Sequence, residues 1–276
     1  MFSWLIREVK SISGCSLYVD SGNVYITKGK AEGFPCMVAH MDTVHDIVED
    51  LVAIQVGRNV TGINPVNMRQ SGIGGDDKVG IFIALECLRR FDNLKVVFFR
   101  DEEEGCLGSY DADIRFFKNC NFVLQCDRQG ASDFVITACG VKLSSRKFQS
   151  KIAHLLNMFD YQPSLGMMTD VMALKERGVD CSVANMSCGY FNPHTPNEFV
   201  NLDDVERCLE LVKSIITEMG HIKFPHEYSR PHLPWLPAQK LLNLNTAQYC
   251  QDCWAPVVAG VSYCEGCAEY YRQTTW

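Results

Sequence analysis

The sequence lacks any long hydrophobic run and any excess of positive charge. No apolar stretch approaches the roughly 18 uninterrupted residues that cross a membrane. The opening MFSWLIREVK has too short an apolar run before Arg7 and Glu8 for a signal peptide. With 33 acidic and 26 basic residues, the formal net charge is −7, which argues against a general nucleic-acid-binding surface. We therefore expect neither a membrane nor a nucleic acid as a partner.

Cysteine, in contrast, is abundant, with 14 in 276 residues. Ten of these cysteines are scattered, mostly within apolar runs, where free cysteine behaves as a small buried hydrophobic residue. This usage is typical of reducing surroundings, because disulfides form and persist in oxidising ones. We therefore expect a cytoplasmic protein. The last four cysteines follow a different pattern near the C-terminus.

The pattern of the first 220 residues predicts alternating strands and helices. Near-continuous apolar runs are typical of strands that are covered on both faces of a sheet. The expected strands are a hairpin at 15–29 and the segments 34–42, 94–99, 121–127 and 181–191, and the expected helices are 76–91, 169–178 and 201–220. This alternation predicts an α/β sandwich with a mostly parallel central sheet.

The character of the sequence changes after residue 220. Residues 221–248 contain four of the ten prolines and show little hydrophobic periodicity. This composition predicts a linker or an extended arm over the domain surface. We therefore divide the chain into a main domain at 1–220, a linker or arm at 221–248, and a small terminal unit at 249–276.

Polar side chains collect where the expected strands end, which is where ligands bind in open α/β sheets. The candidates there are His40, Asp42, Asp76, Asp77, Glu102, Glu103, Asp127 and His194. Taken singly, a histidine is more often a packed or surface residue, and an acidic pair at a helix start more often caps the helix. The run DEEE at 101–104 is harder to explain in this way, because four like charges directly follow an apolar strand. Bound metal ions would neutralise them.

Five stretches in a fixed order carry a family resemblance. They are AHMDTV, GIGGDDKVG, DEEEGCLGS, LQCD and GYFNPHTPNEFV, between residues 39 and 200. Together they resemble the co-catalytic zinc peptidase family that includes peptidase T, carboxypeptidase G and succinyl-diaminopimelate desuccinylase. The resemblance implies a three-layer α/β sandwich of the zinc-peptidase and phosphorylase type, with residues 1–220 as a metallopeptidase-like catalytic domain.

The resemblance also implies the ligands of two metal ions. His40 and Asp127 would bind one ion, Glu103 and His194 would bind the other, and Asp76 would bridge the two. The peptide bond after Asp76 would be cis. Two neighbouring cations can activate a water, polarise a carbonyl and stabilise the oxyanion that forms. Carboxylates and neutral histidines suit zinc, with manganese or cobalt as alternatives.

Two further roles follow from the same resemblance. Asp42 would orient His40, since residues two apart share a face of a strand and a carboxylate commonly holds a metal-ligating imidazole. Glu102 would be the general base, taking a proton from the metal-bridging water and passing it to the leaving nitrogen. A shift of one position would make Glu103 the base and Glu104 the ligand. The family pattern has one residue between the ligand glutamate and a glycine, so Gly105 favours the first register.

One departure from the family concerns the segment between the fourth ligand and the last histidine. Two-domain members carry a whole lid domain there, whereas residues 141–168 leave room for a strand, one helix and a loop. We therefore expect an open site that accepts a longer peptide or a protein terminus. Arg128, Tyr190 and Asn192 could contact a substrate, or could equally be surface or packing residues. Asp170 also matches a family segment near the site, but a helix-start aspartate is its plainer interpretation.

The C-terminal unit contains two CxxC pairs, Cys250/Cys253 and Cys264/Cys267. This spacing predicts a structural zinc held by four cysteines in a zinc ribbon, with two disulfides or free thiols as the alternative. Such a closed site leaves no open position for catalysis. The segment is more acidic than basic, so it lacks a phosphate-binding face, and its aromatic residues suit contact with a protein partner.

Three hypotheses for function follow. The first is a dinuclear metal-dependent hydrolase of peptide or amide bonds, most simply an aminopeptidase-like exopeptidase. The second is an N-acyl amino acid deacylase or carboxypeptidase-like hydrolase on the same metal platform. The third is a catalytically dead fold that binds a protein partner through its zinc ribbon. Zinc content separates the hydrolases from the third, because only the hydrolases need a metal pair in addition to the structural ion.

Overall fold

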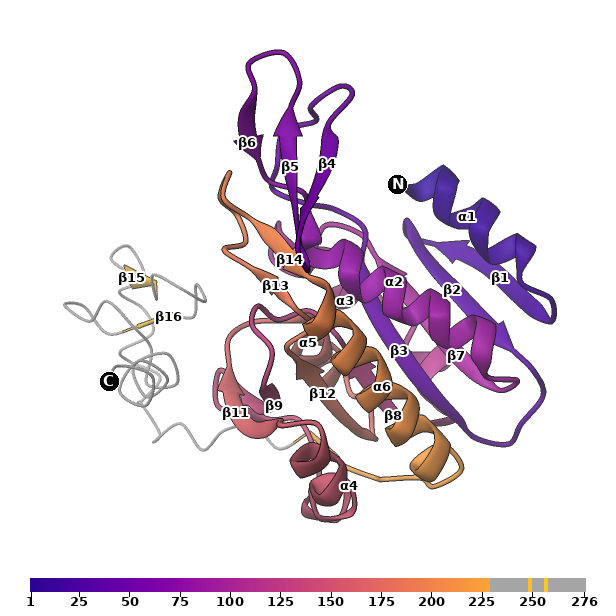
Figure 1. Ribbon diagram of the computed structural model, residues 1–276. Helices are drawn as coiled ribbons and strands as arrows, with labels where there is room; N and C mark the ends of the chain where they lie inside the picture. The colour runs from indigo at the N-terminus through magenta and orange to yellow at the C-terminus, as the bar shows by residue number, and fades with distance from the viewer. Residues whose placement is uncertain (229–247, 250–255, 258–276) are drawn as a thin grey trace.

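The computed structural model describes residues 1–228, 248–249 and 256–257. Its central element is a nine-stranded sheet with the order β1-β2-β7-β3-β8-β12-β9-β10, in which β11 also pairs with β9 (Figure 1). The strands are β1 (Cys15–Asp20), β2 (Asn23–Lys28), β3 (Phe34–His40), β7 (Leu94–Phe99), β8 (Cys120–Gln125), β9 (Asp133–Ala138), β10 (Val141–Lys142), β11 (Gln162–Gly166) and β12 (Ser182–Met186). The strands expected from the apolar runs therefore form, except that the one expected at 181–191 is divided into β12 and a separate strand β13 (Tyr190–Phe191).

Helices cover both faces of this sheet. One face packs against α1 (Phe2–Ser11), α2 (Gly75–Arg90), α4 (Arg146–Met158) and α6 (Leu202–Met219), and the other against the short α3 (Leu107–Tyr110), a 3₁₀ turn at Ile114–Phe117 and α5 (Asp170–Glu176). Alternate residues of one strand enter different cores: in β3, Met37 and Ala39 join the first core, whereas Cys36 and Val38 join the second. This period of two explains why the central strands are apolar on both faces.

The sheet is mixed, not mostly parallel. The four central strands β7, β3, β8 and β12 run parallel to one another. The outer pairs β1–β2, β2–β7, β12–β9 and β9–β10 are antiparallel, and only β11 adds a further parallel pair. Short turns allow antiparallel hairpins at the edges, while the parallel centre needs helical crossovers. The expectation of a mostly parallel sheet is therefore correct only for the centre.

A second, smaller sheet was not expected. It consists of β4 (Val52–Val56), β5 (Asn59–Asn64), β6 (Arg69–Ser71), β13 (Tyr190–Phe191) and β14 (Phe199–Asn201). Strands β4, β5 and β6 project from the body of the domain (Figure 1). Strand β14 pairs with β5 although the two lie far apart in the sequence. This sheet connects the segment after His40 with the segment around His194.

The segment between residues 141 and 168 forms β10, α4 and β11, and it contains no separate domain. This agrees with the expected strand, helix and loop. After α6, residues 224–226 stay on the main domain: Phe224 is fully buried, and its carbonyl accepts the N–H of Ser182 at 2.8 Å. No helix within the described ranges is both long and apolar enough to cross a membrane.

The C-terminal unit is described only in two short strands. Strand β15 (Gln248–Tyr249) pairs antiparallel with β16 (Pro256–Val257). The four cysteines of the expected zinc ribbon lie outside the described residues. The ribbon therefore stays a prediction.

Candidate metal centre

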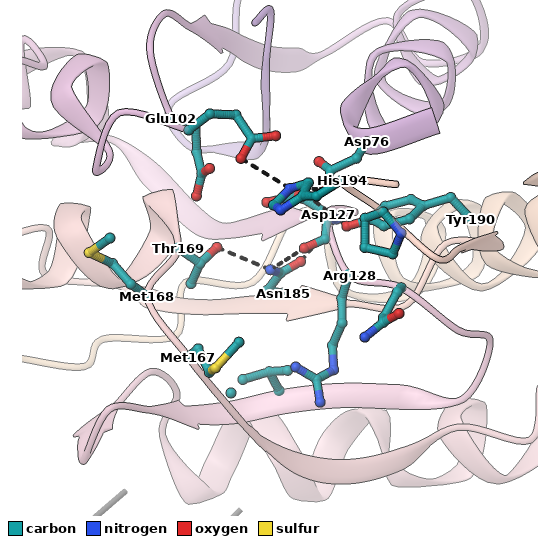
Figure 2. Close-up of a pocket in the computed structure, with 15 residues that line it drawn as sticks. Asp76, Glu102, Asp127, Arg128, Met167, Met168, Thr169, Asn185, Tyr190 and His194 are labelled. Carbon is teal, nitrogen blue, oxygen red and sulfur yellow. Dashed lines mark hydrogen bonds and ion pairs between the residues drawn. The ribbon is translucent and has the colours of Figure 1, made fainter. Parts of the chain in front are cut away.

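The candidate ligands come together at one edge of the main sheet. His40 is the last residue of β3, Glu103 follows β7 and Asp127 follows β8, so three neighbouring strand ends each supply one side chain. Asp76 lies at the start of α2, and His194 follows β13. Figure 2 shows Asp76, Asp127 and His194 pointing toward one another in one pocket. Sequence segments from residue 40 to residue 194 thus meet in one place.

The two histidines approach opposite oxygens of the same carboxylate. Nε2 of His40 lies 3.0 Å from Oδ1 of Asp76 and 3.6 Å from Oδ1 of Asp127. Nε2 of His194 lies 3.3 Å from Oδ2 of Asp76 and 3.1 Å from Oε2 of Glu103. Asp76 therefore lies between the two histidines, with Asp127 beside His40 and Glu103 beside His194.

The donor atoms at this edge fit divalent metal ions. The side chains of His40, Asp76 and Glu103 each offer a ligand atom within 4.8 Å of the others, and so do those of His40, Asp77 and Asp127. Oε1 of Glu103 is buried and has no hydrogen-bond partner among the described residues. A cluster of buried carboxylates with an unpaired oxygen needs a cation to offset its desolvation and mutual repulsion.

Asp77 is already bonded to the backbone. Its Oδ2 accepts the N–H of His40 at 3.1 Å, and its Oδ1 accepts the N–H of Gly80 at 3.0 Å. These bonds hold the end of β3 against the start of α2. The peptide bond between Asp76 and Asp77 is cis, which confirms the expectation from the family resemblance.

The carboxylate of Asp42 lies beside the ring of His40 and accepts two backbone hydrogen bonds from the DEEE loop. Its Oδ1 lies 3.4 Å from Nδ1 of His40, which is the ring nitrogen that faces away from Asp76. The same carboxylate accepts the backbone N–H groups of Glu102 and Glu103 at 3.1 and 3.0 Å. Asp42 therefore holds the DEEE loop by two hydrogen bonds and places its carboxylate beside the imidazole of His40.

Glu102 and Glu103 both line the cavity, whereas Glu104 is exposed to solvent. The thiol of Cys106 donates a hydrogen bond to Oε1 of Glu102 at 3.4 Å. Burial, together with the nearby charge of Asp127, raises the pKa of Glu102 well above its ordinary value. A carboxylate with a raised pKa is suited to accept and then return a proton.

Within the cluster, the pKa values of the two histidines are raised, whereas the pKa of the Asp76 carboxyl is lowered. Burial lowers the pKa of His40, but hydrogen bonds with Asp127 and other carboxylates outweigh it and raise this pKa well above the usual value. Hydrogen bonds with Asp76 and Glu103 raise the pKa of His194 to about 10. For Asp76, burial acts to raise the pKa, but hydrogen bonds with His194 and His40 lower it overall. Without metal, protons on the imidazoles take the place of the cations.

Behind the ligands lies a network of neutral polar side chains. Asn185 accepts the backbone N–H of Asp127 at 2.9 Å and donates to the hydroxyl of Thr169 at 3.0 Å. Gln125 donates to Asp127 at 3.0 Å and to Asp170 at 3.1 Å. Residues 125 and 185 are adjacent strand partners of β8 and β12. The network therefore fixes the orientation of the Asp127 carboxylate.

Asp170 does begin helix α5, but it is not a simple surface residue at a helix start. Its side chain is fully buried, and its Oδ1 has no hydrogen-bond partner among the described residues. Burial, opposed by the charge of His40, raises the pKa of Asp170 to about 7. The interpretation as a helix-start aspartate is therefore confirmed, and the side chain also accepts a hydrogen bond from Gln125, which contacts the proposed ligand Asp127.

Glu198 is a part of the site that the sequence interpretation did not single out. It is fully buried, and its two oxygens accept the backbone N–H groups of Gly74 at 2.6 Å and Asp76 at 3.0 Å. Nε2 of His45 lies 2.9 Å from the same carboxylate. Glu198 belongs to the quoted stretch GYFNPHTPNEFV, so the motif contained it, but nothing in the motif indicates that it is buried.

The three candidate substrate contacts have different surroundings. Tyr190 is buried and donates a hydrogen bond from its hydroxyl to Oδ1 of Asp127 at 3.2 Å, so it supports a ligand. Arg128 lines the cavity, and its Nε donates to Asp133 at 2.7 Å. Asn192 does not line the cavity and instead donates to the carbonyl of Asn197 at 3.4 Å.

Solved structures share this fold. Aminopeptidase PepT from Bacillus cereus ATCC 10987 superposes with a TM-score of 0.61 at 14% identity, covering 79% of this chain and 92% of that one. The aminopeptidase APDkam598 from the archaeon Desulfurococcus kamchatkensis superposes with a TM-score of 0.62 at 15% identity, covering 79% of this chain and 89% of that one. A tripeptidase from Staphylococcus aureus subsp. aureus Mu50 superposes with a TM-score of 0.62 at 13% identity, covering 78% of this chain and 91% of that one.

No protein-family model matches the sequence, and no curated protein matches it. At these identities the likeness to solved structures concerns the fold alone. The chain therefore has a mixed α/β fold of the kind found in these aminopeptidases.

Proposed function

We propose that this protein is a dinuclear metal-dependent hydrolase of peptide or amide bonds. The observation that carries the proposal is the placement of Nε2 of His40 and Nε2 of His194 at opposite oxygens of Asp76. Asp127 completes the first set of ligands, and Glu103 completes the second. A carboxylate between two ligand sets is the arrangement that a metal pair requires.

Each of the chain's own residues has a distinct task in the proposed reaction. Bound between these ligands, two divalent cations would polarise the scissile carbonyl and lower the pKa of a water. Glu102 accepts a proton from the attacking water and delivers it to the leaving nitrogen. Asp42 keeps His40 and the backbone of Glu102 in position through the contacts described above. Zinc suits this ligand set, with manganese or cobalt as alternatives.

For the substrate, we propose a peptide or a protein terminus, with aminopeptidase-like exopeptidase activity as the first candidate. The shared fold with an archaeal and a bacterial aminopeptidase supports this choice. The second candidate is an N-acyl amino acid deacylase or carboxypeptidase-like hydrolase. The guanidinium of Arg128 in the wall of the cavity favours this second candidate, because it suits a substrate carboxylate.

For the C-terminal unit, we propose a structural zinc held by Cys250, Cys253, Cys264 and Cys267. Strands β15 and β16 flank the first cysteine pair, which supports a knuckle at that position. The unit would then be a docking element for a protein partner, separate from the catalytic domain at 1–220.

The experiment that tests the proposed activity is a screen of aminoacyl and N-acyl chromogenic amides with added zinc, manganese or cobalt. We expect metal-dependent release of the chromophore, abolished by chelation and restored by the metal. A protein that binds only the structural zinc and cleaves none of these amides would instead favour a catalytically dead fold that acts through its zinc ribbon.

A further inference from the structure

Two further cavities lie along the outer side of α2, away from the metal centre. Figure 1 shows α2 between α1 and α6 on one face of the main sheet. A cavity of about 510 Å³ lies on the side of α1, and one of about 290 Å³ lies on the side of β5, β14 and α6. Among the described residues, none that lines either cavity also lines the cavity at the metal centre. A ligand here would therefore not occupy the metal centre.

The two cavities meet along α2 and are together called the α2 groove. Lys78 and Phe82 line both of them. These two residues belong to a stripe that continues along the helix to Leu85 and Arg89, because residues three and four apart share one side of a helix. At 1.5 Å per residue, the stripe from Lys78 to Arg89 is about 16 Å long. The groove is therefore elongated in the direction of the helix.

The walls of the α2 groove are apolar. Trp4 and Phe82 stand at its rim with 43% and 44% of their surface exposed, whereas Ile81 and Leu85 are buried beneath them. Beyond Phe82, the side chains that line the second cavity are all aliphatic, namely Val60, Ile73, Val79, Val200, Leu202 and Val205. Contiguous exposed apolar surface of this kind marks a binding site more often than a bare protein surface.

The charges of the α2 groove have one sign. Lys78 and Arg89 line it, and no carboxylate among the described residues does, although the chain has a net charge of −7. The guanidinium of Arg89 is paired with Glu86 at 2.7 Å and with Glu8 at 3.1 Å. Nζ of Lys78 instead donates to a neutral group, the carbonyl of Ile73, at 2.6 Å. An ammonium has three donors, so Lys78 can bind an anion as well.

We propose that the α2 groove binds a long-chain carboxylate, with its head group at Lys78 and its acyl chain between Trp4 and Phe82. The inference is independent of the proposed hydrolase function, because no residue of the metal centre takes part. An acyl chain suits the groove better than a peptide does. None of the described lining side chains offers a hydrogen-bond acceptor, so the N–H groups of a buried peptide would lose their partners.

Titration calorimetry of the whole, zinc-loaded chain with decanoate and with decanol tests the inference. The two probes have the same chain length and differ in the charge of the head group. We expect one decanoate per chain, bound about 10-fold more tightly than decanol or better, because hydrogen bonds between charged groups are the stronger ones. Octanoate, which is shorter by two methylene groups, should bind more than about 10-fold more weakly than decanoate, since each buried methylene contributes roughly fourfold.

Substitutions separate the charge from the apolar wall. Lys78→Gln should lower the affinity for decanoate to that for decanol, while its amide still offers a donor to the carbonyl of Ile73. Lys78→Arg should keep the preference for decanoate. Phe82→Ala should weaken the binding of both probes alike. Met158→Ala is the matched control, since Met158 is 69% exposed on α4 and lines neither cavity, and it should change neither affinity.

Several results would overturn the inference. Equal affinity for decanoate and decanol, or a preference that survives in Lys78→Gln, would show that Lys78 does not bind the head group. A preference lost in Arg89→Gln and kept in Lys78→Gln would place the head group at the wrong end of the groove. Binding of many molecules without saturation would indicate an adventitious additive only.

Sedimentation velocity tests the other possible occupant, which is a second copy of the chain. We expect the same oligomeric state for the natural protein and for Phe82→Ala, with and without decanoate. A dimer that excludes decanoate and that Phe82→Ala dissociates would show that a second copy covers the groove, and the inference would be wrong.

Discussion

The buried carboxylate of Glu198 accepts a hydrogen bond from the backbone N–H of Asp76 at 3.0 Å. Its other oxygen accepts the N–H of Gly74 at 2.6 Å and lies 2.9 Å from Nε2 of His45. Glu198 thereby fixes the loop that carries the carboxylate shared by the two ligand sets. It acts on the proposed metal pair through the position of Asp76.

Glu198→Gln should weaken metal binding. An amide keeps one acceptor oxygen but turns N–H donors toward a backbone N–H, so one of the two loop bonds is lost. Partners that orient metal ligands typically contribute about 10–100-fold in affinity, and we expect a loss near the lower value. Competition with a zinc-binding dye measures this loss, and kcat should fall while KM stays similar.

His45→Gln is the control for this prediction, since it leaves both backbone bonds to Glu198 intact. It should cost less zinc affinity than Glu198→Gln. Unchanged affinity and unchanged kcat in Glu198→Gln, with the protein folded, would show that the loop keeps its position without the carboxylate.

The neighbouring acids Glu102 and Glu103 should respond differently to the same substitution. Glu102→Gln should retain both metal ions and lose most turnover, because an amide cannot accept the proton of the attacking water. Glu103→Gln should lose the metal ion of the His194 set. Metal content by mass spectrometry and kcat on the best chromogenic amide distinguish the two. Near-normal kcat in metal-loaded Glu102→Gln would rule out Glu102 as the base.

Much of the main sheet could be predicted, because apolar runs such as LKVVFF at 94–99 leave few alternatives to a buried strand. The polar residues that follow these runs placed His40, Glu103 and Asp127 at the carboxyl ends of β3, β7 and β8. Both features depend on local sequence. The helical period of residues 201–220 likewise predicted α6, which begins after the cap at Asn201.

The features that could not be predicted depend on long-range pairing. Every residue of β4 is exposed, so its sequence VAIQV gives no burial pattern that identifies a strand. Strand β5 is completed by β14, which lies more than a hundred residues later. The burial of Glu198 follows from the same pairing. The hairpin at 15–29 was expected and forms the antiparallel edge β1–β2. The antiparallel pairs β2–β7, β12–β9 and β9–β10 were missed, because an apolar strand has the same sequence pattern in either direction.

Zinc binding should release protons and become tighter as the pH rises. Hydrogen bonds with Asp76 and Glu103 raise the pKa of His194 to about 10, so the metal-free site holds this proton at neutral pH. The raised pKa stabilises the metal-free fold fully below the unfolded value of roughly 6.5, and this stabilisation is lost as the pH rises through about 10. Zinc must displace the proton, since a ligand histidine is neutral.

Calorimetry at one pH in buffers of different ionisation enthalpy measures this proton release. In protein whose structural zinc is already bound, His194→Gln should release fewer protons than the natural protein when zinc fills the site at Asp76. Zinc affinity that is independent of pH between 6 and 8, without proton release, would contradict the charge state assigned to the metal-free site.

Replacing Cys250 and Cys253 with serine should lower the zinc content by the structural ion alone. The catalytic pair should stay occupied, because the main domain has its own cores on both faces of the sheet. Turnover of a small chromogenic amide should therefore survive. Loss of that turnover with the main domain still folded would show that the C-terminal unit helps to build the active site.

The central claim is that Asp76 bridges two metal ions, and a zinc-edge anomalous difference map of zinc-loaded crystals tests it most directly. The account predicts two peaks about 3.5–4 Å apart, one beside His40 and Asp127 and one beside His194 and Glu103, with an oxygen of Asp76 at each. A single peak, or two peaks of which either has no contact with Asp76, would contradict the account.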